Sequence, residues 1–198
     1  MPHPIRCSCG AVRGAFDSSS GPANRLVCYC KDCQSFAHFL KRPHDILDRY
    51  GGSEIVQTLP RSITFTAGVE NLACMRLSEK GLMRWYARCC NTPIGNTLDN
   101  PQFAFVGLVH SCLDQDGQSL EMAFGPIRAV AFTKSAKGGN LKQKGLVGAV
   151  VRTAVMLARG RLNGSYRSTP FFKADLKTPI VQPQVLSPQE REQLRAAL

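Results

Sequence analysis

The order of apolar and polar positions predicts short strands in the first two thirds of the chain. Residues 61–68 (RSITFTAG) alternate apolar side chains with threonines, as a half-buried strand does. Residues 82–87 and 102–113 are rich in aromatic and β-branched side chains, which favour strands. The Asp-Gly pair at 116–117 is typical of a hairpin turn that leads into residues 119–124. This part of the chain is therefore expected to be mainly β.

The last third of the chain has a different period. Apolar residues in the segment 146–159 recur with helical spacing around a narrow strip of glycines and arginines. We expect a helix near 145–160 that either packs on the β-rich part or lies on a membrane surface. A second helix is expected near 188–198, because Ser187, Pro188 and Glu190 form a capping-box pattern. The apolar run near 146–158 is too short for a transmembrane segment.

Charge divides the chain at about the same place. Residues 1–127 contain 12 Lys and Arg against 11 Asp and Glu, whereas residues 128–198 contain 13 against 3. We therefore predict a domain over 1–130 and a basic extension over 131–198. The first residues lack the apolar stretch of a secretory signal, so we expect a cytoplasmic protein.

The nine cysteines are the strongest indication of chemistry. In a reducing compartment, clustered thiols are more often metal ligands or reactive groups than disulfides, and an odd number argues against a complete disulfide framework. Seven of the nine fall into three groups, which are Cys7 and Cys9; Cys28, Cys30 and Cys33; and Cys89 and Cys90. Buried cysteines without metal are the alternative interpretation.

The spacing predicts two metal sites. Cys7 and Cys9 can both turn toward one cation, and the pair at 89–90 is far enough along the chain to complete a tetrahedron from a neighbouring strand. The group at 28–33 then forms a separate site with three ligands. A closed four-ligand site is usually structural, whereas three protein ligands leave a position for water or substrate.

The motifs CSCG (7–10), CYCKDC (28–33) and RWYARCCNTP (84–93) together resemble the glutathione-dependent formaldehyde-activating enzyme family, which includes centromere protein V. That family has the pattern C-x-C-G, C-x-C-x-x-C and a late C-x-x-C-G-T. The resemblance covers roughly residues 5–125. It implies a β-tent fold, in which small antiparallel sheets fold over a structural zinc held by the first and third groups, and a second, exposed zinc at the middle group.

The resemblance also implies an activity and a partner. The family's namesake reaction joins or releases formaldehyde and glutathione as S-hydroxymethylglutathione, a carbon–sulfur lyase reaction. We therefore expect two zinc ions per chain and a small thiol substrate such as glutathione. Cys28, Cys30 and Cys33 would hold the reactive metal.

The chain departs from the family pattern at the third group. Ala87 stands where the family has a ligand, and Asn91 stands where it has glycine. Cys89 is the obvious substitute, but adjacent residues in an extended strand point in opposite directions. Cys89 can join Cys90 on one zinc only if the backbone bulges. Cys74 or Cys112 are the alternative fourth ligands.

The donor set favours thiol chemistry. Three thiolates make zinc a weak Lewis acid, better suited to exchange of a thiolate ligand than to hydrolysis. Lys31, Lys41 and Arg42 are either partners for the carboxylates of an anionic thiol or solvated surface residues. A non-catalytic zinc module whose basic extension binds nucleic acid or an acidic partner is the alternative function.

Overall fold

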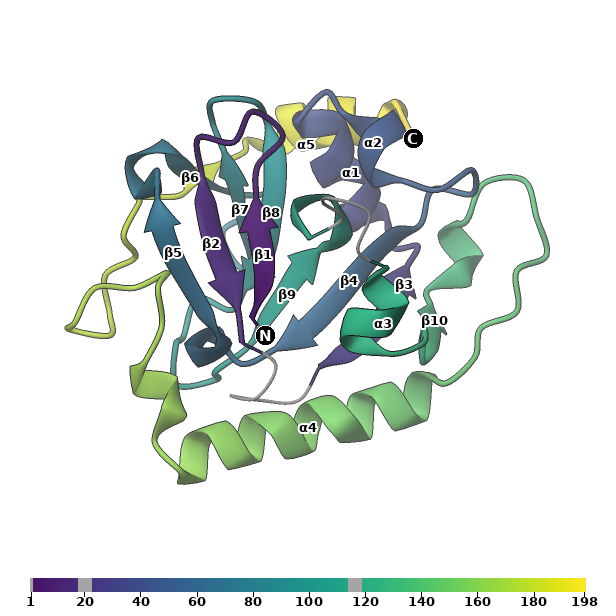
Figure 1. Cartoon of the computed structure of the whole chain (residues 1–198). Helices are drawn as coiled ribbons and strands as arrows, with labels where there is room; N and C mark the ends of the chain where they lie inside the picture. Colours follow the sequence, from purple (N-terminus) through teal and green to yellow (C-terminus); the bar gives the residue numbers. More distant parts are fainter. Residues whose placement is uncertain (1, 18–22, 114–118) are drawn as a thin grey trace.

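The computed structural model describes residues 2–17, 23–113 and 119–198, and these form a mainly β structure with two sheets. The smaller sheet has the order β1-β2-β5, with both pairings antiparallel. Its strands are β1 (His3–Arg6), β2 (Arg13–Phe16) and β5 (Ile63–Ala67). It faces the larger sheet in Figure 1.

The larger sheet has the order β10-β3-β4-β9-β8-β7-β6-β11. Its central strands run antiparallel, and β10 and β11 add to the two edges in parallel. In chain order, the strands are β3 (Asn24–Cys28), β4 (Ser53–Thr58), β6 (Leu72–Arg76), β7 (Met83–Ala87), β8 (Thr92–Thr97), β9 (Val106–Val109), β10 (Ala129–Ala131) and β11 (Gln184–Val185).

Five helices lie around these sheets in the described residues. They are α1 (Lys31–Phe39), α2 (Pro43–Ile46), α3 (Leu120–Phe124), α4 (Leu146–Leu162) and α5 (Pro188–Ala196). Single turns of 3-10 helix occupy Pro60–Ser62, Val69–Asn71, His110–Cys112, Thr133–Ser135 and Ser165–Arg167. None of the described helices is long and apolar enough to cross a membrane.

The main core lies between the two sheets. Ile5 and Phe16 from the smaller sheet pack in one cluster with Trp85 and Leu108 from the larger sheet, and each of these is at most 1% exposed. Alternation along the strands directs these side chains to the shared interior. The apolar side chains in the first two thirds of the chain therefore face each other across the two sheets and form this core.

The basic segment 131–198 packs on the same sheet. Strand β11 pairs with β6, and the side chain of Phe171 is fully buried in the main core. Strand β10, whose last residue is the first of this segment, pairs with β3. Helix α5 contacts α1 near the other end of the sheet (Figure 1). The two parts distinguished by charge therefore share one sheet and one core.

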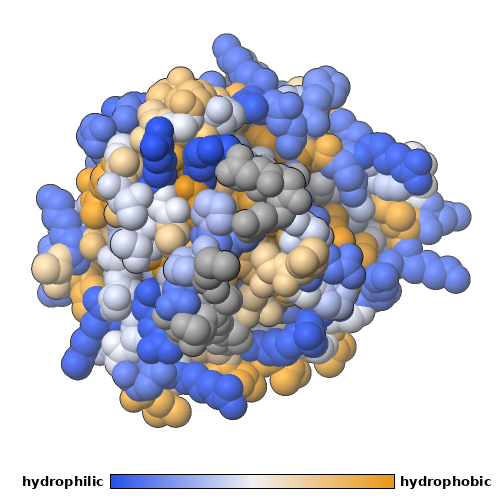
Figure 2. Space-filling view, viewed as in Figure 1, coloured by the Kyte–Doolittle hydropathy of each residue, from blue (hydrophilic) through white to orange (hydrophobic). Residues whose placement is uncertain are grey.

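Helix α4 lies along one face of the large sheet. Its residues Ala149, Met156 and Gly160 are buried, which confirms the prediction of a helix packed on the β-rich part. Its outer face carries exposed apolar residues, including Val147 and Leu162. Figure 2 shows apolar side chains along the lower edge of the molecule, where α4 lies.

The strand predictions have one error. The segments 61–68, 82–87 and 102–113 contain β5, β7 and β9, as predicted, although β9 is shorter than the predicted segment. Residues 120–124 form α3 and not the second strand of a hairpin. Ser119 caps this helix, and Leu120 and Phe124 lie one turn apart and are both buried. The predicted turn at 116–117 lies outside the described residues.

Candidate metal centres

Four cysteines from two distant segments form the first centre, which we call the four-cysteine cluster: Cys7, Cys9, Cys89 and Cys90. The Sγ–Sγ distances are 3.5 Å for Cys7–Cys9 and 3.3 Å for Cys9–Cys89. They are 3.8 Å for Cys7–Cys89 and for Cys89–Cys90. Four sulfurs placed about 2.3 Å from one ion form a tetrahedron with edges of about 3.8 Å. The cluster therefore fits a tetrahedral metal ion with little movement.

The first pair sits on a tight turn between β1 and β2. Gly10 adopts a φ of 76°, and its N–H donates to the Cys7 carbonyl at 2.9 Å. The Val12 N–H donates to the Cys7 sulfur at 3.2 Å. Backbone donors stabilise a thiolate, and glycine allows the left-handed turn that aims them inward. The CSCG motif thus builds its own half of the cluster.

The second pair lies in the turn between β7 and β8, not in an extended strand. Residues 88–91 form this turn, and Asn91 takes a φ of 54° where the family pattern has glycine. Asparagine tolerates this left-handed conformation better than most residues. The turn carries the sulfurs of Cys89 and Cys90 to the same side, which removes the geometric objection to two adjacent ligands.

The other candidates for the fourth ligand lie elsewhere. Cys112 is fully buried, and its thiol donates to the carbonyls of Val109 and Ile94. Cys74 lies within β6, and burial raises the pKa of both thiols to about 12. Ala87 is fully buried in the main core. Among the described residues, Cys89 therefore completes the cluster.

Polar groups surround the side of the four-cysteine cluster near Cys90. Burial opposes ionisation of Cys90, but hydrogen bonds with Ser8 and Thr92 outweigh it and lower its pKa to about 5. The Arg42 guanidinium donates to the Cys90 carbonyl at 3.1 Å and to the Ser8 hydroxyl at 2.8 Å. A nearby cation and hydroxyl donors favour the thiolate form that metal binding requires.

Cys28, Cys30 and Cys33 form the second centre, which we call the three-cysteine cluster. Cys28 ends β3, Cys30 is the N-cap of α1, and Cys33 lies in the first turn of that helix. All three sulfurs lie within 4.8 Å of one another, and the Cys33 N–H donates to the Cys30 sulfur at 3.4 Å. A strand end followed at once by a helix N-terminus therefore converges the three thiols.

The environment of the cluster shifts the pKa values of its thiols in different directions. Hydrogen bonds from Cys28 and Cys33, the Cys33 backbone N–H and the charge of Arg84 lower the pKa of Cys30. The shared hydrogen bonds with Cys30 and Cys33, together with burial, raise the pKa of Cys28. Without a cation the cluster thus favours one thiolate, whereas a bound metal ion would stabilise all three.

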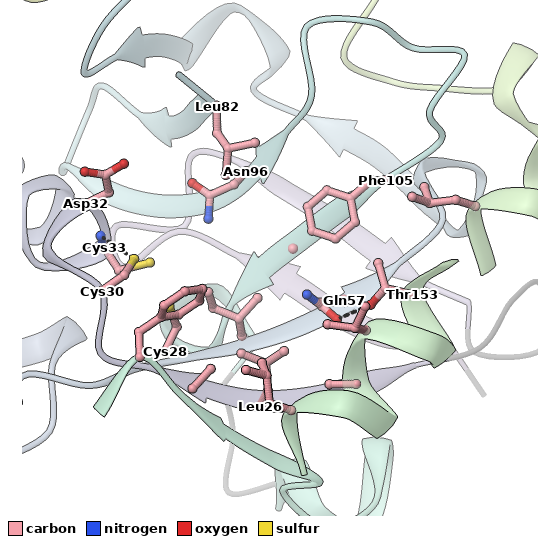
Figure 3. A pocket seen from close by; sticks show the side chains of 18 of the residues that line it. Leu26, Cys28, Cys30, Asp32, Cys33, Gln57, Leu82, Asn96, Phe105 and Thr153 are labelled. Carbon is pink, nitrogen blue, oxygen red and sulfur yellow. Dashed lines mark hydrogen bonds between the residues drawn. The ribbon is translucent and has the colours of Figure 1, made fainter. Parts of the chain in front are cut away.

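The resemblance implied an exposed middle site, and the structure corrects this. Cys28 and Cys33 are 6% and 8% exposed, whereas Cys9 and Cys89 of the other cluster are exposed. The three-cysteine cluster lies at one end of a cavity of about 530 Å³ between the large sheet and α4 (Figure 3). Access to this cluster therefore runs through the cavity.

Arg84 is a residue of this site that the sequence reasoning missed. It is 3% exposed, lines the cavity and donates to the Asn96 side-chain oxygen at 3.2 Å. None of the ion pairs found among the described residues includes Arg84, and its Nε is buried without a hydrogen-bond partner there. A buried guanidinium needs a negative partner. Three thiolates on a divalent ion carry a net charge of −1, which Arg84 would neutralise.

The basic residues considered from the sequence do not line the cavity. Lys31 and Lys41 are exposed, and Arg42 lies against the four-cysteine cluster. The sequence feature that could have indicated Arg84 is a single arginine inside the apolar segment LMRWYA. Asn96 and Gln57 also line the cavity, and both turn their amide nitrogens toward it (Figure 3).

Comparison with known proteins places the chain in a family. A model of the family of unknown function DUF6151 matches residues 2–181. No curated protein matches the chain. The crystal structure of a Rhodobacter sphaeroides protein is similar over 63% of this chain and 96% of its own, at 16% identity and a TM-score of 0.40, a likeness too distant to support an argument. Because the family model spans both cysteine clusters and α4, the chain belongs to the family of unknown function DUF6151.

Proposed function

We propose that both clusters bind zinc and that the three-cysteine cluster acts on thiol adducts, as a carbon–sulfur lyase does. The observation that carries the proposal is the opening of three converging cysteines into a cavity of small-molecule size. The four-cysteine cluster offers a closed tetrahedral site and would be structural. The three-cysteine cluster leaves one coordination position for a ligand from the cavity.

The donor sets favour zinc on chemical grounds. Thiolates are soft ligands, and tetrahedral sulfur sites are typical of zinc or iron–sulfur centres. When bound, zinc would supply a fourth position at which a substrate sulfur can be held as a thiolate. The buried charge of Arg84 supports a site that carries negative charge overall.

The reaction proposed is the reversible cleavage of a hydroxymethyl thioether into a thiol and an aldehyde. The carbon–sulfur bond breaks and its electron pair returns to sulfur, while the O–H pair becomes the second bond of the carbonyl group. The hydroxyl proton is transferred to solvent or to the released thiolate, so nothing is oxidised or reduced. The Asn96 amide nitrogen faces the cavity and is suited to bind the hydroxyl oxygen (Figure 3).

The alternative function, a non-catalytic module that binds nucleic acid or an acidic partner, depends on charge. Lys134, Lys137, Lys142 and Lys144 are exposed in the segment that precedes α4. The basic segment also contributes β11 and one wall of the cavity, so much of it has a role in the fold. We therefore favour the thiol-adduct function.

Zinc content and the rate of exchange between formaldehyde and a thiol together test the proposal. The purified protein should contain about two zinc ions per chain and accelerate exchange between formaldehyde and a thiol, measured by nuclear magnetic resonance. Cys30→Ser should retain one zinc and lose the exchange, because it removes a ligand of the three-cysteine cluster alone. One zinc per chain in the unaltered protein, or equal exchange by Cys30→Ser, would contradict the proposal.

A further inference from the structure

The cavity that leads to the three-cysteine cluster is lined mainly by apolar side chains. Leu26 and Ile55 form part of its floor on the sheet, and Leu146, Ala149 and Leu157 of α4 line the opposite side. Phe105 lies across the cavity from Leu26 (Figure 3). The lining thus consists of aliphatic and aromatic surfaces from elements that are distant in sequence.

Charged groups in the lining are few and already engaged. Among the described residues that line the cavity, the charged ones are Arg84 and Asp32. Arg84 donates to Asn96, and its charge would balance the net charge of −1 of the metal-loaded three-cysteine cluster. Asp32 forms a surface ion pair with Arg195. A thiol with carboxylates and an ammonium group, such as glutathione, would bury these charges without partners, which is costly.

We infer that the substrate of this site is a small thiol, or its aldehyde adduct, with an uncharged apolar body. Its sulfur binds at the three-cysteine cluster and its body fills the cavity beneath α4. The cavity volume of about 530 Å³ lies within the usual range for small-molecule sites. This inference rests on the proposed function, because it needs an open metal position at the three-cysteine cluster.

The amide of Gln57 refines the class of molecule. Gln57 accepts hydrogen bonds from Thr153 of α4 at 2.9 Å and from Asn24 at 2.7 Å, which fixes its orientation. Its amide nitrogen therefore faces the cavity, at the opposite end from the cysteines (Figure 3). Such a donor can bind one neutral acceptor, such as a carbonyl or ether oxygen, at the far end of an apolar ligand.

A series of straight-chain thiols tests the inference. Ethanethiol, butanethiol and hexanethiol are titrated into the protein reconstituted with Co²⁺, whose absorption changes when a further thiolate binds. The dissociation constant should fall roughly fourfold for each added methylene, because each is removed from water. Glutathione should bind more weakly than hexanethiol, and hexanol should not compete at the same concentration.

Variants of α4 show where the body of the thiol binds. Ala154→Leu adds volume to the cavity lining and should weaken hexanethiol binding at least tenfold while leaving ethanethiol binding unchanged. Ala154 is exposed, so this variant should fold. Ala149→Leu adds the same volume beside Cys28 and Cys33 and should weaken the binding of both thiols. Val147→Leu is the control, because Val147 is 80% exposed and outside the lining.

The possible results separate the two proposals. Equal affinities across the series, tighter binding of glutathione than of hexanethiol, or equal competition by hexanol would overturn the inference while leaving the open metal site intact. A spectrum that no thiol changes, in a protein that holds two cobalt ions, would instead refute the open position itself. Cys30→Ser should show no thiol-dependent change and serves as the baseline.

Discussion

Truncation of Phe171 should destabilise the protein strongly, although this residue lies in the basic segment beyond the cysteine motifs. Its side chain is fully buried, with its ring centroid 5.1 Å from that of Trp85 and 5.8 Å from that of Phe65. It follows α4 in the chain and anchors the segment that forms one wall of the cavity. Phe171→Ala therefore tests whether this segment is part of the folding unit.

The expected loss follows from burial. A buried Phe→Ala substitution costs about 3–5 kcal/mol through lost transfer energy and the cavity left behind. The two aromatic contacts favour the upper part of this range, since each such pair contributes about 0.5–1.5 kcal/mol beyond its area. Phe103→Ala is the matched control, because Phe103 is 56% exposed and its loss should change stability by less than about 0.5 kcal/mol.

The measurement is equilibrium unfolding in urea, followed by circular dichroism and by fluorescence of Trp85, the single tryptophan. Both probes should show one transition with a lowered midpoint for Phe171→Ala. The reasoning would be refuted if this variant unfolded within about 1 kcal/mol of the unaltered protein. It would also be refuted if a chain that ends near Gly138 retained full stability, because the core would then not need the segment.

Three other predictions concern the clusters and the charge. Cys30→Ser should lose one zinc with little change in stability, because serine also caps α1. Cys89→Ser should lose one zinc and also lower the melting temperature markedly, because structural metal binding contributes to folding. Unchanged zinc content in Cys89→Ser would place the fourth ligand elsewhere. Arg84→Met should weaken zinc binding at the three-cysteine cluster by about 10–100-fold, measured by chelator competition. Arg84→Lys should retain most of the affinity, because it keeps the positive charge. Equal losses in both variants would argue against a charge effect. Any binding of DNA should be weak and fall steeply with added salt in an electrophoretic shift assay, and a salt-resistant, sequence-selective complex would favour the alternative function.

Local sequence was sufficient for much of the candidate sites. The spacing of Cys28, Cys30 and Cys33 implied a single cluster, because ligands a few residues apart can converge without help from the rest of the fold. The grouping of Cys7 and Cys9 with the pair at 89–90 was also predicted, and the structure brings these four sulfurs together. The strands at 61–68 and 82–87 followed from residue type and alternation, which depend on near neighbours.

Other features depended on contacts between distant segments. The turn at 88–91 settled how Cys89 and Cys90 reach one cluster, because backbone conformation at Asn91 cannot be inferred from strand periodicity. Residues 120–124 became a helix because burial of Leu120 and Phe124 on one face outweighed the turn-based expectation of a hairpin.

The cavity is the part of the site that only the tertiary structure decided. Its lining includes residues of β3, β4, β7, β8, β9, α1 and α4, which the chain brings together over more than a hundred residues. The burial of Arg84 beside the cysteines likewise depends on how β7 lies in the large sheet, with β6 and β8 on either side. Spacing between cysteines indicated two clusters that could hold a metal ion, whereas the packing of α4 on the sheet determined what can reach the three-cysteine cluster.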